Sequence, residues 1–177
     1  MTLPIVGLIG PESTGKTTLA QELAQEFETI YVPEFGRYYC EILGNQCDAD
    51  DLRAIVRGHN LMVGFAKRKA RHFLILDTDA VMTAIWSDIL LGSRPPDLDR
   101  VDDPADFYLV TDIDVPFAAD AIRYFPDQAT RADMLSRCRK ELERRALPYA
   151  LISGSREARS RQAITAIREL FGDRLAK

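Results

Sequence analysis

The sequence has 177 residues, of which 46% are hydrophobic and 28% charged, and its formal net charge is -4. This composition is typical of one soluble globular domain with a sizeable core and excludes a disordered chain. The negative charge argues against a broad surface for nucleic acid or anionic membrane, and no apolar run approaches the ~18 residues of a membrane span. We therefore expect a single domain over residues 1–177, with neither nucleic acid nor membrane as a partner.

Targeting and redox signals point the same way. The N-terminal segment has no basic leader before its short apolar run, so we expect no signal peptide. The three cysteines, Cys40, Cys47 and Cys138, form an odd set without CxxC spacing. We interpret them as reduced thiols of a cytoplasmic protein.

The first half of the chain alternates short apolar runs with amphipathic segments. Residues 4–9 form a β-branched run that ends in a glycine loop, as in a central buried strand. Helical spacing begins at Lys16, and a second strand is expected over 29–33. A long helix follows over 48–71, with acidic residues at its start and basic residues near its end, as the helix dipole favours.

The second half repeats this alternation. A buried strand is expected over 73–76, a helix over 81–89 closed by Gly92, and a Pro- and Asp-rich loop over 93–106. A strand at 107–111, a charged helix at 130–146, a strand at 149–152 and a final helix to about 171 complete the order. Alternating strands and helices predict an α/β fold of three layers, with a five-stranded parallel sheet flanked by helices.

The most informative motif follows the first strand. It consists of Gly10, Pro11, Glu12, Ser13, Thr14, Gly15, Lys16 and Thr17, and it matches the P-loop pattern G-x-x-x-x-G-K-[ST]. Its glycines let backbone N–H groups, including those near Thr18, point at phosphate oxygens at a helix N-terminus. Lys16 is expected to reach the β- and γ-phosphates of ATP, and the Thr17 hydroxyl to ligate Mg²⁺.

A P-loop protein needs a carboxylate opposite that threonine to hold the metal. Asp77 directly follows the third strand and is the candidate. Asp79 either shares this role, points into an acceptor pocket, or serves as a helix N-cap. The chain has no N-K-x-D sequence and no D-x-x-G after the third strand, so a GTPase is disfavoured. A compact small-molecule kinase remains.

Four segments carry a more specific resemblance, namely GPESTGKTTL (10–19), VPEFGRYY (32–39), LDTDAVMTAIW (76–86) and TDIDVPFAADAIRYFPD (111–127). Together they make nearly the whole chain similar to the nicotinamide riboside kinase-type domain of the NadR family. The resemblance implies a P-loop kinase that transfers phosphate from ATP, with Mg²⁺, to the 5′-hydroxyl of nicotinamide riboside. The chain departs from the family at Phe117, where Trp is common, and at Ala121, where Gly is common.

Residues after the second strand are candidates for acceptor chemistry. Glu34 lies where nucleoside-kinase-like folds place the carboxylate that accepts the proton of the acceptor hydroxyl, and a solvated loop glutamate is the alternative. Arg37 is expected to anchor ribose or phosphate, while Tyr38 or Tyr39 stacks on a ring and the other packs in the core. Trp86 lies on an apolar helical face, so core packing is its default and stacking on the acceptor ring its alternative.

Residues 114–131 resemble the lid segment of small kinases. An arginine there stabilises the transferring phosphoryl group, with Arg123 the first choice and Arg131 the second. Asp114 and Asp120 are expected either to orient this arginine or to bind acceptor hydroxyls. Ser153 and Gly154, after the fifth strand, are expected beside the adenine by analogy of fold.

Three functions follow from these observations. The leading one is an ATP-dependent kinase of nicotinamide riboside, in NAD salvage. The alternatives are a kinase of another nucleoside-like metabolite and a regulatory nucleotide switch without a small-molecule acceptor.

Overall fold

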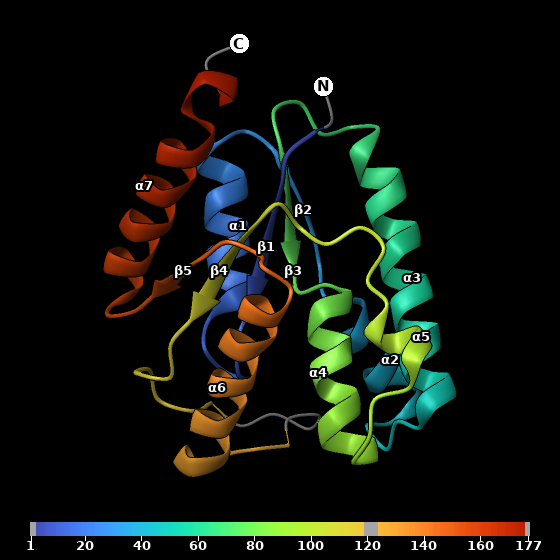
Figure 1. The fold of residues 1–177 in the computed structure, drawn as a ribbon. Helices are drawn as coiled ribbons and strands as arrows, with labels where there is room; N and C mark the ends of the chain where they lie inside the picture. Colours follow the sequence, from blue (N-terminus) through green and yellow to red (C-terminus); the bar gives the residue numbers. More distant parts are fainter. Residues whose placement is uncertain (1–2, 119–123, 176–177) are drawn as a thin grey trace.

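The computed structural model describes residues 3–118 and 124–175. Its centre is a sheet of five parallel strands in the order β2-β3-β1-β4-β5. The strands are β1 (Ile5–Ile9), β2 (Ile30–Val32), β3 (Leu74–Asp77), β4 (Phe107–Thr111) and β5 (Tyr149–Ile152). Because all strands run the same way, their carboxyl ends share one edge of the sheet (Figure 1). The predicted parallel α/β fold is confirmed.

The helices are α1 (Lys16–Glu26), α2 (Phe35–Leu43), α3 (Ala49–Lys67), α4 (Ala80–Leu91), α5 (Pro96–Asp99), α6 (Gln128–Arg144) and α7 (Arg156–Leu175). They cover both faces of the sheet (Figure 1). Buried side chains of α1 and α7 pack on one face, among them Leu23 and Ile167. Those of α3, α4 and α6 pack on the other, among them Val63, Ile85 and Leu142. The layers are thus helix, sheet and helix.

The ends of two helices follow local chemistry that the sequence displays. Asp48 caps α3, and its carboxylate accepts from the backbone of Asp50 and Asp51 in a reciprocal capping box. Gly92 ends α4 with a φ of 66°, a left-handed conformation that glycine adopts without strain. Both helix ends match the predicted elements within a few residues, although α3 ends at Lys67 rather than at residue 71.

Two helices were not predicted. The short α5 interrupts the loop predicted over residues 93–106, and α2 follows β2 after only two residues. Helix α2 packs on α3 so closely that a Cβ on Gly58 would lie 2.3 Å from the Phe35 ring. Phe35 and Tyr39 also contact a small cluster around Leu52. Contacts with α3 therefore hold a segment whose own sequence signals for a helix are weak.

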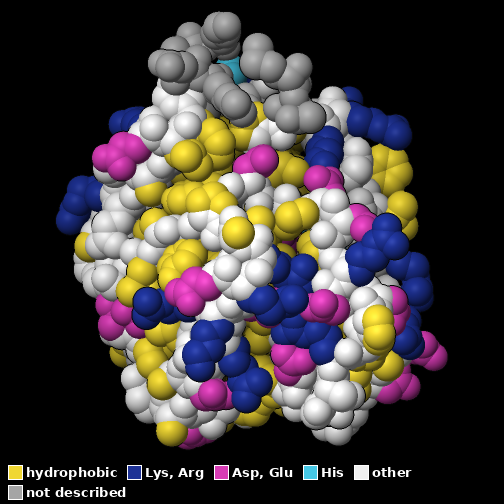
Figure 2. All heavy atoms as spheres, viewed as in Figure 1, with side chains coloured by type: hydrophobic (Ala, Val, Ile, Leu, Met, Phe, Trp, Pro, Cys, Tyr) yellow, Lys and Arg dark blue, Asp and Glu magenta, His cyan; other side chains and the backbone are white. Residues whose placement is uncertain are grey.

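Charges on the surface are mixed. On the face shown in Figure 2, Lys and Arg side chains are interspersed with Asp and Glu. The buried Glu141 belongs to an ion-pair network, in which it accepts from Arg94, Arg144 and Arg145. Burial raises the pKa of Glu141, but these bonds outweigh it and lower the pKa to about 2. None of the helices in the described ranges is long and apolar enough to cross a membrane.

Candidate active site

The P-loop connects β1 to α1 and contacts Thr111 at the end of β4, in a conformation that its glycines permit. Gly10 has a φ of 148°, and a Cβ there would lie 2.5 Å from the Thr111 hydroxyl oxygen. Gly15, with a φ of 82°, occupies the N-cap position of α1. The Thr14 hydroxyl donates to the Pro11 carbonyl over 2.7 Å and contacts the Thr111 hydroxyl at 2.6 Å. The loop is thereby held open at the N-terminus of α1, where backbone N–H groups attract phosphate.

Lys16 lies across the mouth of this loop. Its ammonium group donates to the carbonyls of Gly10 and Pro11, over 2.9 and 2.8 Å. These are modest bonds to neutral acceptors, and a polyphosphate offers the same ammonium a charged partner. Lys16 is therefore positioned to exchange them for phosphate oxygens.

Thr17 and Asp77 meet as the sequence predicts. The Thr17 hydroxyl donates to Asp77 Oδ2 over 2.6 Å. Asp77 is 1% exposed, and its Oδ1 has no hydrogen-bond partner among the described residues. Burial raises the pKa of Asp77, whereas the bond from Thr17 and the charge of Lys16 lower it. An orphaned carboxylate oxygen beside a threonine hydroxyl fits a hydrated Mg²⁺ ion.

The other ligands of such an ion would come from the nucleotide and from water. Within the described ranges no group of three or more His, Cys, Asp and Glu side chains forms a metal site. Magnesium characteristically uses one or two protein oxygens together with substrate phosphates and water. Thr17 and Asp77 match that requirement.

Glu34 lies beside these residues at the start of α2. It occupies the N-cap position of that helix and lines a cavity with an empty volume of about 670 Å³. Burial raises its pKa, an effect that Lys16 opposes and that Asp77 strengthens. Glu34 is therefore electrostatically coupled to the P-loop while facing the cavity, and a carboxylate of raised pKa is suited to accept a proton near neutral pH.

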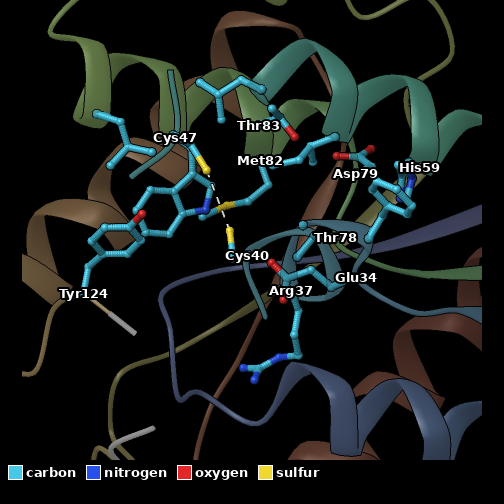
Figure 3. A pocket seen from close by; sticks show the side chains of 16 residues that line it. Glu34, Arg37, Cys40, Cys47, His59, Thr78, Asp79, Met82, Thr83 and Tyr124 are labelled. Atoms are coloured by element: carbon cyan, nitrogen blue, oxygen red, sulfur yellow. Dashed lines mark hydrogen bonds between the residues drawn. The ribbon is translucent and has the colours of Figure 1, made fainter. Parts of the chain in front are cut away.

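One wall of the cavity is aromatic. Trp86, from α4, stacks on Phe125 with 5.8 Å between ring centroids and 17° between planes, and lies 5.5 Å from the Tyr124 ring. Trp86, Tyr124 and Arg37 all line the cavity. Figure 3 labels Tyr124 and Arg37 in its wall. A planar ring fits against such a surface. Trp86 also packs against the hydrophobic core, as expected by default, and its stacking on an acceptor ring stays a prediction.

Asp79 lines the same cavity, but both of its oxygens have protein partners. Its Oδ1 caps α4 by accepting from Val81 N at 2.9 Å, and its Oδ2 accepts a hydrogen bond from Tyr108. The N-cap role considered for Asp79 is therefore present, and its role toward substrate stays a prediction. Nearby, burial lowers the pKa of His59, whose Nε2 has no partner among the described residues.

The pair of tyrosines lies away from the cavity. Tyr38 is 48% exposed, and the Tyr39 hydroxyl donates to Asp51 Oδ1 at 2.6 Å. Neither lines the cavity, in contrast to Glu34 and Arg37 on the same turn of chain. Ring stacking by Tyr38 or Tyr39 on a substrate stays a prediction without support from this geometry.

The P-loop also accepts hydrogen bonds from two parts of the connection between β4 and α6. Ser13 Oγ accepts from Ala118 N at 2.7 Å, while Glu12 Oε2 accepts from Tyr124 N at 2.9 Å and from Phe125 N at 3.2 Å. The variable positions of the motif therefore connect the phosphate site to the aromatic wall. Asp120, Ala121 and Arg123 lie outside the described residues.

Arg131 is placed beneath that segment. It is 2% exposed, donates to the Val115 carbonyl at 3.2 Å, and places its guanidinium carbon 5.8 Å from the centroid of the Phe117 ring. These contacts tie α6 to the residues that follow β4. A direct bond from Arg131 to nucleotide stays a prediction.

Arg159, which was not predicted, supports the P-loop from the side of α7. Arg159, 5% exposed on α7, donates to the carbonyls of Thr14, Asp112 and Gly154 over 2.9–3.0 Å and pairs with Asp114. Asp114 also accepts from Gly154 N. Asp114 is thus bound on the P-loop side and does not line the aromatic cavity.

A second hollow lies on that side, between the P-loop and α7. Its walls include Ser13, Thr18, Val115, Arg156 and Arg159. Ser153 and Gly154 precede α7 next to it, and Ser153 N donates to the Gln162 side chain at 3.1 Å. P-loop residues form part of the wall of this second hollow, together with arginines of α7. The aromatic cavity contains no P-loop residue in its wall and approaches the loop at Glu34.

The sequence has recognisable relatives among known proteins. A family model described as "AAA domain" matches residues 5–159. The trifunctional NAD biosynthesis/regulator protein NadR of Escherichia coli K12 is 27% identical over 175 residues, covering 95% of this chain and 43% of NadR. NadR of Salmonella typhimurium LT2 is 33% identical over 124 residues, covering 67% of this chain and 30% of that protein. The chain therefore spans less than half the length of these relatives.

Solved structures agree on the fold. A NadR protein in complex with NR has a TM-score of 0.77 at 22% identity, and the match covers 97% of this chain and 52% of that one. Thymidylate kinase from Ehrlichia chaffeensis has a TM-score of 0.65 at 13% identity, with 94% and 100% covered. The resemblance to NadR predicted from sequence motifs is confirmed.

Proposed function

Since the chain belongs to the AAA domain family and is a P-loop domain homologous to part of NadR, we propose that it is an ATP-dependent kinase acting on the 5′-hydroxyl of nicotinamide riboside. The observation that carries this proposal is the place of Glu34. Its carboxylate lies between a phosphate loop with Lys16 and a cavity lined by Trp86. A carboxylate at that junction can orient an acceptor hydroxyl, and the cavity beside it provides room for the acceptor.

The phosphate side requires little rearrangement. ATP binding transfers Lys16 from two loop carbonyls to the β- and γ-phosphates, while loop N–H groups bind the remaining oxygens. Thr17 and Asp77 would hold Mg²⁺, which neutralises charge on the phosphates when bound. Arg159 keeps the carbonyl of Thr14 fixed and with it the shape of the loop.

Transfer then follows from positioning. The acceptor oxygen forms a bond to the γ-phosphorus, the bond from that phosphorus to the β,γ-bridging oxygen breaks, and the hydroxyl proton passes to Glu34. The products are a phosphate monoester and ADP. A general base in this position typically contributes about 10²–10⁴-fold to the rate.

The acceptor assignment rests on shape and homology together. The rings of Trp86 and Tyr124 offer a stacking surface for a pyridine ring. Arg37 also lines the cavity, and its proposed role is to anchor ribose or phosphate. A structural relative is described in complex with NR. Nicotinamide riboside unites a planar ring with a primary hydroxyl and therefore fits both ends of the cavity.

The proposal is tested by measuring ADP release with Mg²⁺-ATP, with and without nicotinamide riboside and a panel of common nucleosides. We expect the largest stimulation from nicotinamide riboside. Glu34→Gln should lose about 10²–10⁴-fold in kcat and keep its affinity for ATP. Glu169→Gln, an exposed change on α7, serves as the matched control.

Each alternative has its own outcome in this experiment. Stimulation by another nucleoside alone would identify a kinase of a different metabolite. Tight ATP binding that no acceptor stimulates, and that Glu34→Gln leaves unaltered, would replace the kinase with a nucleotide switch.

A further inference from the structure

Two of the three cysteines face each other in the wall of the acceptor cavity. Cys40 lies on α2 and Cys47 on the connection to α3, and their sulfur atoms are 3.7 Å apart (Figure 3). Both line the cavity together with Glu34 and Trp86. Both are half-buried, whereas the third cysteine, Cys138, is fully buried on α6. The proposed phosphoryl transfer uses neither thiol of the pair.

The backbone around the pair can bring the sulfurs together. A disulfide bond is about 2.05 Å long, so the two sulfurs must approach by about 1.7 Å. Gly44 ends α2 with a φ of 89°, and nothing lies within 4 Å of the position where its Cβ would be. None of the residues of α2 is fully buried. Little packing therefore opposes a small shift of the turn.

We propose that Cys40 and Cys47 form a dithiol modification site, which hydroperoxides close to an intramolecular disulfide and which thereby reshapes the acceptor cavity. The formation of the disulfide is independent of the kinase activity. Only its consequence for the acceptor rests on the proposed function.

The chemistry takes two steps. Cys47 attacks hydrogen peroxide, the O–O bond breaks, and sulfenic acid and water form. The Cys40 sulfur then attacks the sulfenic sulfur, the S–O bond breaks, and a disulfide and a second water form. The peroxide is reduced by two electrons, and the two thiols supply them.

The surroundings decide which thiol reacts first. Burial raises the pKa of Cys40 to about 12, with further contributions from Cys47, Glu34 and Asp51. Burial also raises the pKa of Cys47, as do Asp51 and Asp48, but the hydrogen bond with Cys40 lowers it. Cys47 therefore forms its thiolate more readily than Cys40 and is the initial nucleophile, with Cys40 as the resolving thiol. Because the pKa of both thiols is raised, the oxidation should be slow at neutral pH and should accelerate as the pH rises.

Closure should act on the acceptor rather than on ATP. Cys40 and Glu34 belong to α2 and its N-cap, so a pull on Cys40 is transmitted to the carboxylate. Because both cysteines line the cavity, the same shift displaces the wall against which the acceptor binds. We expect the KM for nicotinamide riboside to rise about tenfold on oxidation, with ATP affinity unchanged, because the P-loop contacts are not involved.

The direct test maps thiols in the full chain. The protein is treated with hydrogen peroxide, alkylated under denaturing conditions and analysed by peptide mass spectrometry. After tryptic digestion we expect one peptide, residues 38–53, that contains both Cys40 and Cys47, is not alkylated and is lighter by two hydrogens than its reduced form, with Cys138 recovered as a free thiol. Peptides with both cysteines alkylated, over-oxidised singly or joined between molecules would overturn the proposal.

Two further arms separate this result from general oxidation. Phenylarsine oxide bridges close thiol pairs, and it should bind the wild type once per chain, prevent the linkage, and fail to bind Cys47→Ser. If turnover of nicotinamide riboside is present, dithiothreitol should restore the KM of oxidised wild type, and peroxide should leave Cys47→Ser unaffected. A linkage that forms without any such turnover refutes the acceptor and supports the dithiol site. A linkage with an unaltered KM refutes the reshaping of the cavity.

Discussion

Arg159 provides the most quantitative test of how the phosphate site is built. Replacement by methionine keeps much of the aliphatic volume and removes the guanidinium group. The change leaves three carbonyl groups, those of Thr14, Asp112 and Gly154, and the Asp114 carboxylate without their donor. We expect a loss of both folding stability and nucleotide affinity.

The magnitude follows from these contacts. Each net hydrogen bond contributes about 1 kcal/mol, which gives about 4 kcal/mol for four partners. Asp114 is 36% exposed, so water replaces part of its interaction. Gly154 is exposed as well. We therefore expect a loss of about 2–3 kcal/mol, which corresponds to a fall in Tm of roughly 5–10 °C for a domain of this size.

Thermal and urea unfolding followed by circular dichroism measure the stability, and isothermal titration with ATP measures affinity. The control is Arg161→Met, a substitution of an exposed residue two positions further along α7. It should alter the free energy of unfolding by less than about 0.5 kcal/mol. An Arg159→Met protein that matches the control in both Tm and ATP affinity would refute this account of the loop.

Four further predictions concern the rest of the site. Burial raises the pKa of Asp77, so the ionised carboxylate destabilises the fold. Asp77→Asn should therefore abolish Mg²⁺-dependent turnover but raise the Tm at pH 8. This gain in Tm should shrink as the pH falls toward about 4, where the carboxyl group of the unfolded chain becomes protonated. Burial also raises the pKa of Glu34, so kcat/KM should fall with decreasing pH through a value above the ordinary 4.5, and a limb at or below that value would contradict its role as the base. Trp86→Ala should raise the acceptor KM about 2- to 10-fold, the equivalent of one aromatic pair, and an unaltered KM would remove Trp86 from the binding wall. Glu12→Ala should raise the acceptor KM through the loss of the bonds from Tyr124, with Glu12→Gln closer to wild type; identical kinetics of the two variants and wild type would argue against this coupling.

The sequence predicted those parts of the fold and site that depend on local signals. Apolar runs located all five strands, most clearly β1, β3 and β4, which are buried at every position and must therefore be continuously hydrophobic. The P-loop pattern brought Lys16 and Thr17 to the end of β1. Asp77 followed because strand ends of a parallel sheet share one edge, and the bond between Thr17 and Asp77 agrees with it.

Local sequence signals did not predict the contacts between segments that are distant in the chain. Helix α2 depends on the packing of Phe35 against Gly58, more than 20 positions further along the chain, and has no strong cap of its own. Arg159 is one of several arginines on α7, and nothing in its local sequence distinguishes it from the exposed ones. Glu12 occupies a variable position of the motif, and its bonds to Tyr124 and Phe125 span 112 and 113 residues.

The central claim is that phosphate passes from ATP to a hydroxyl of a small acceptor held against Glu34. Phosphorus-31 NMR of the protein with Mg²⁺-ATP and nicotinamide riboside tests this claim most directly. We predict a new phosphate monoester signal that grows in step with ADP and is lost in Glu34→Gln. ADP formed together with inorganic phosphate, or a monoester yield that Glu34→Gln leaves unaltered, would contradict it.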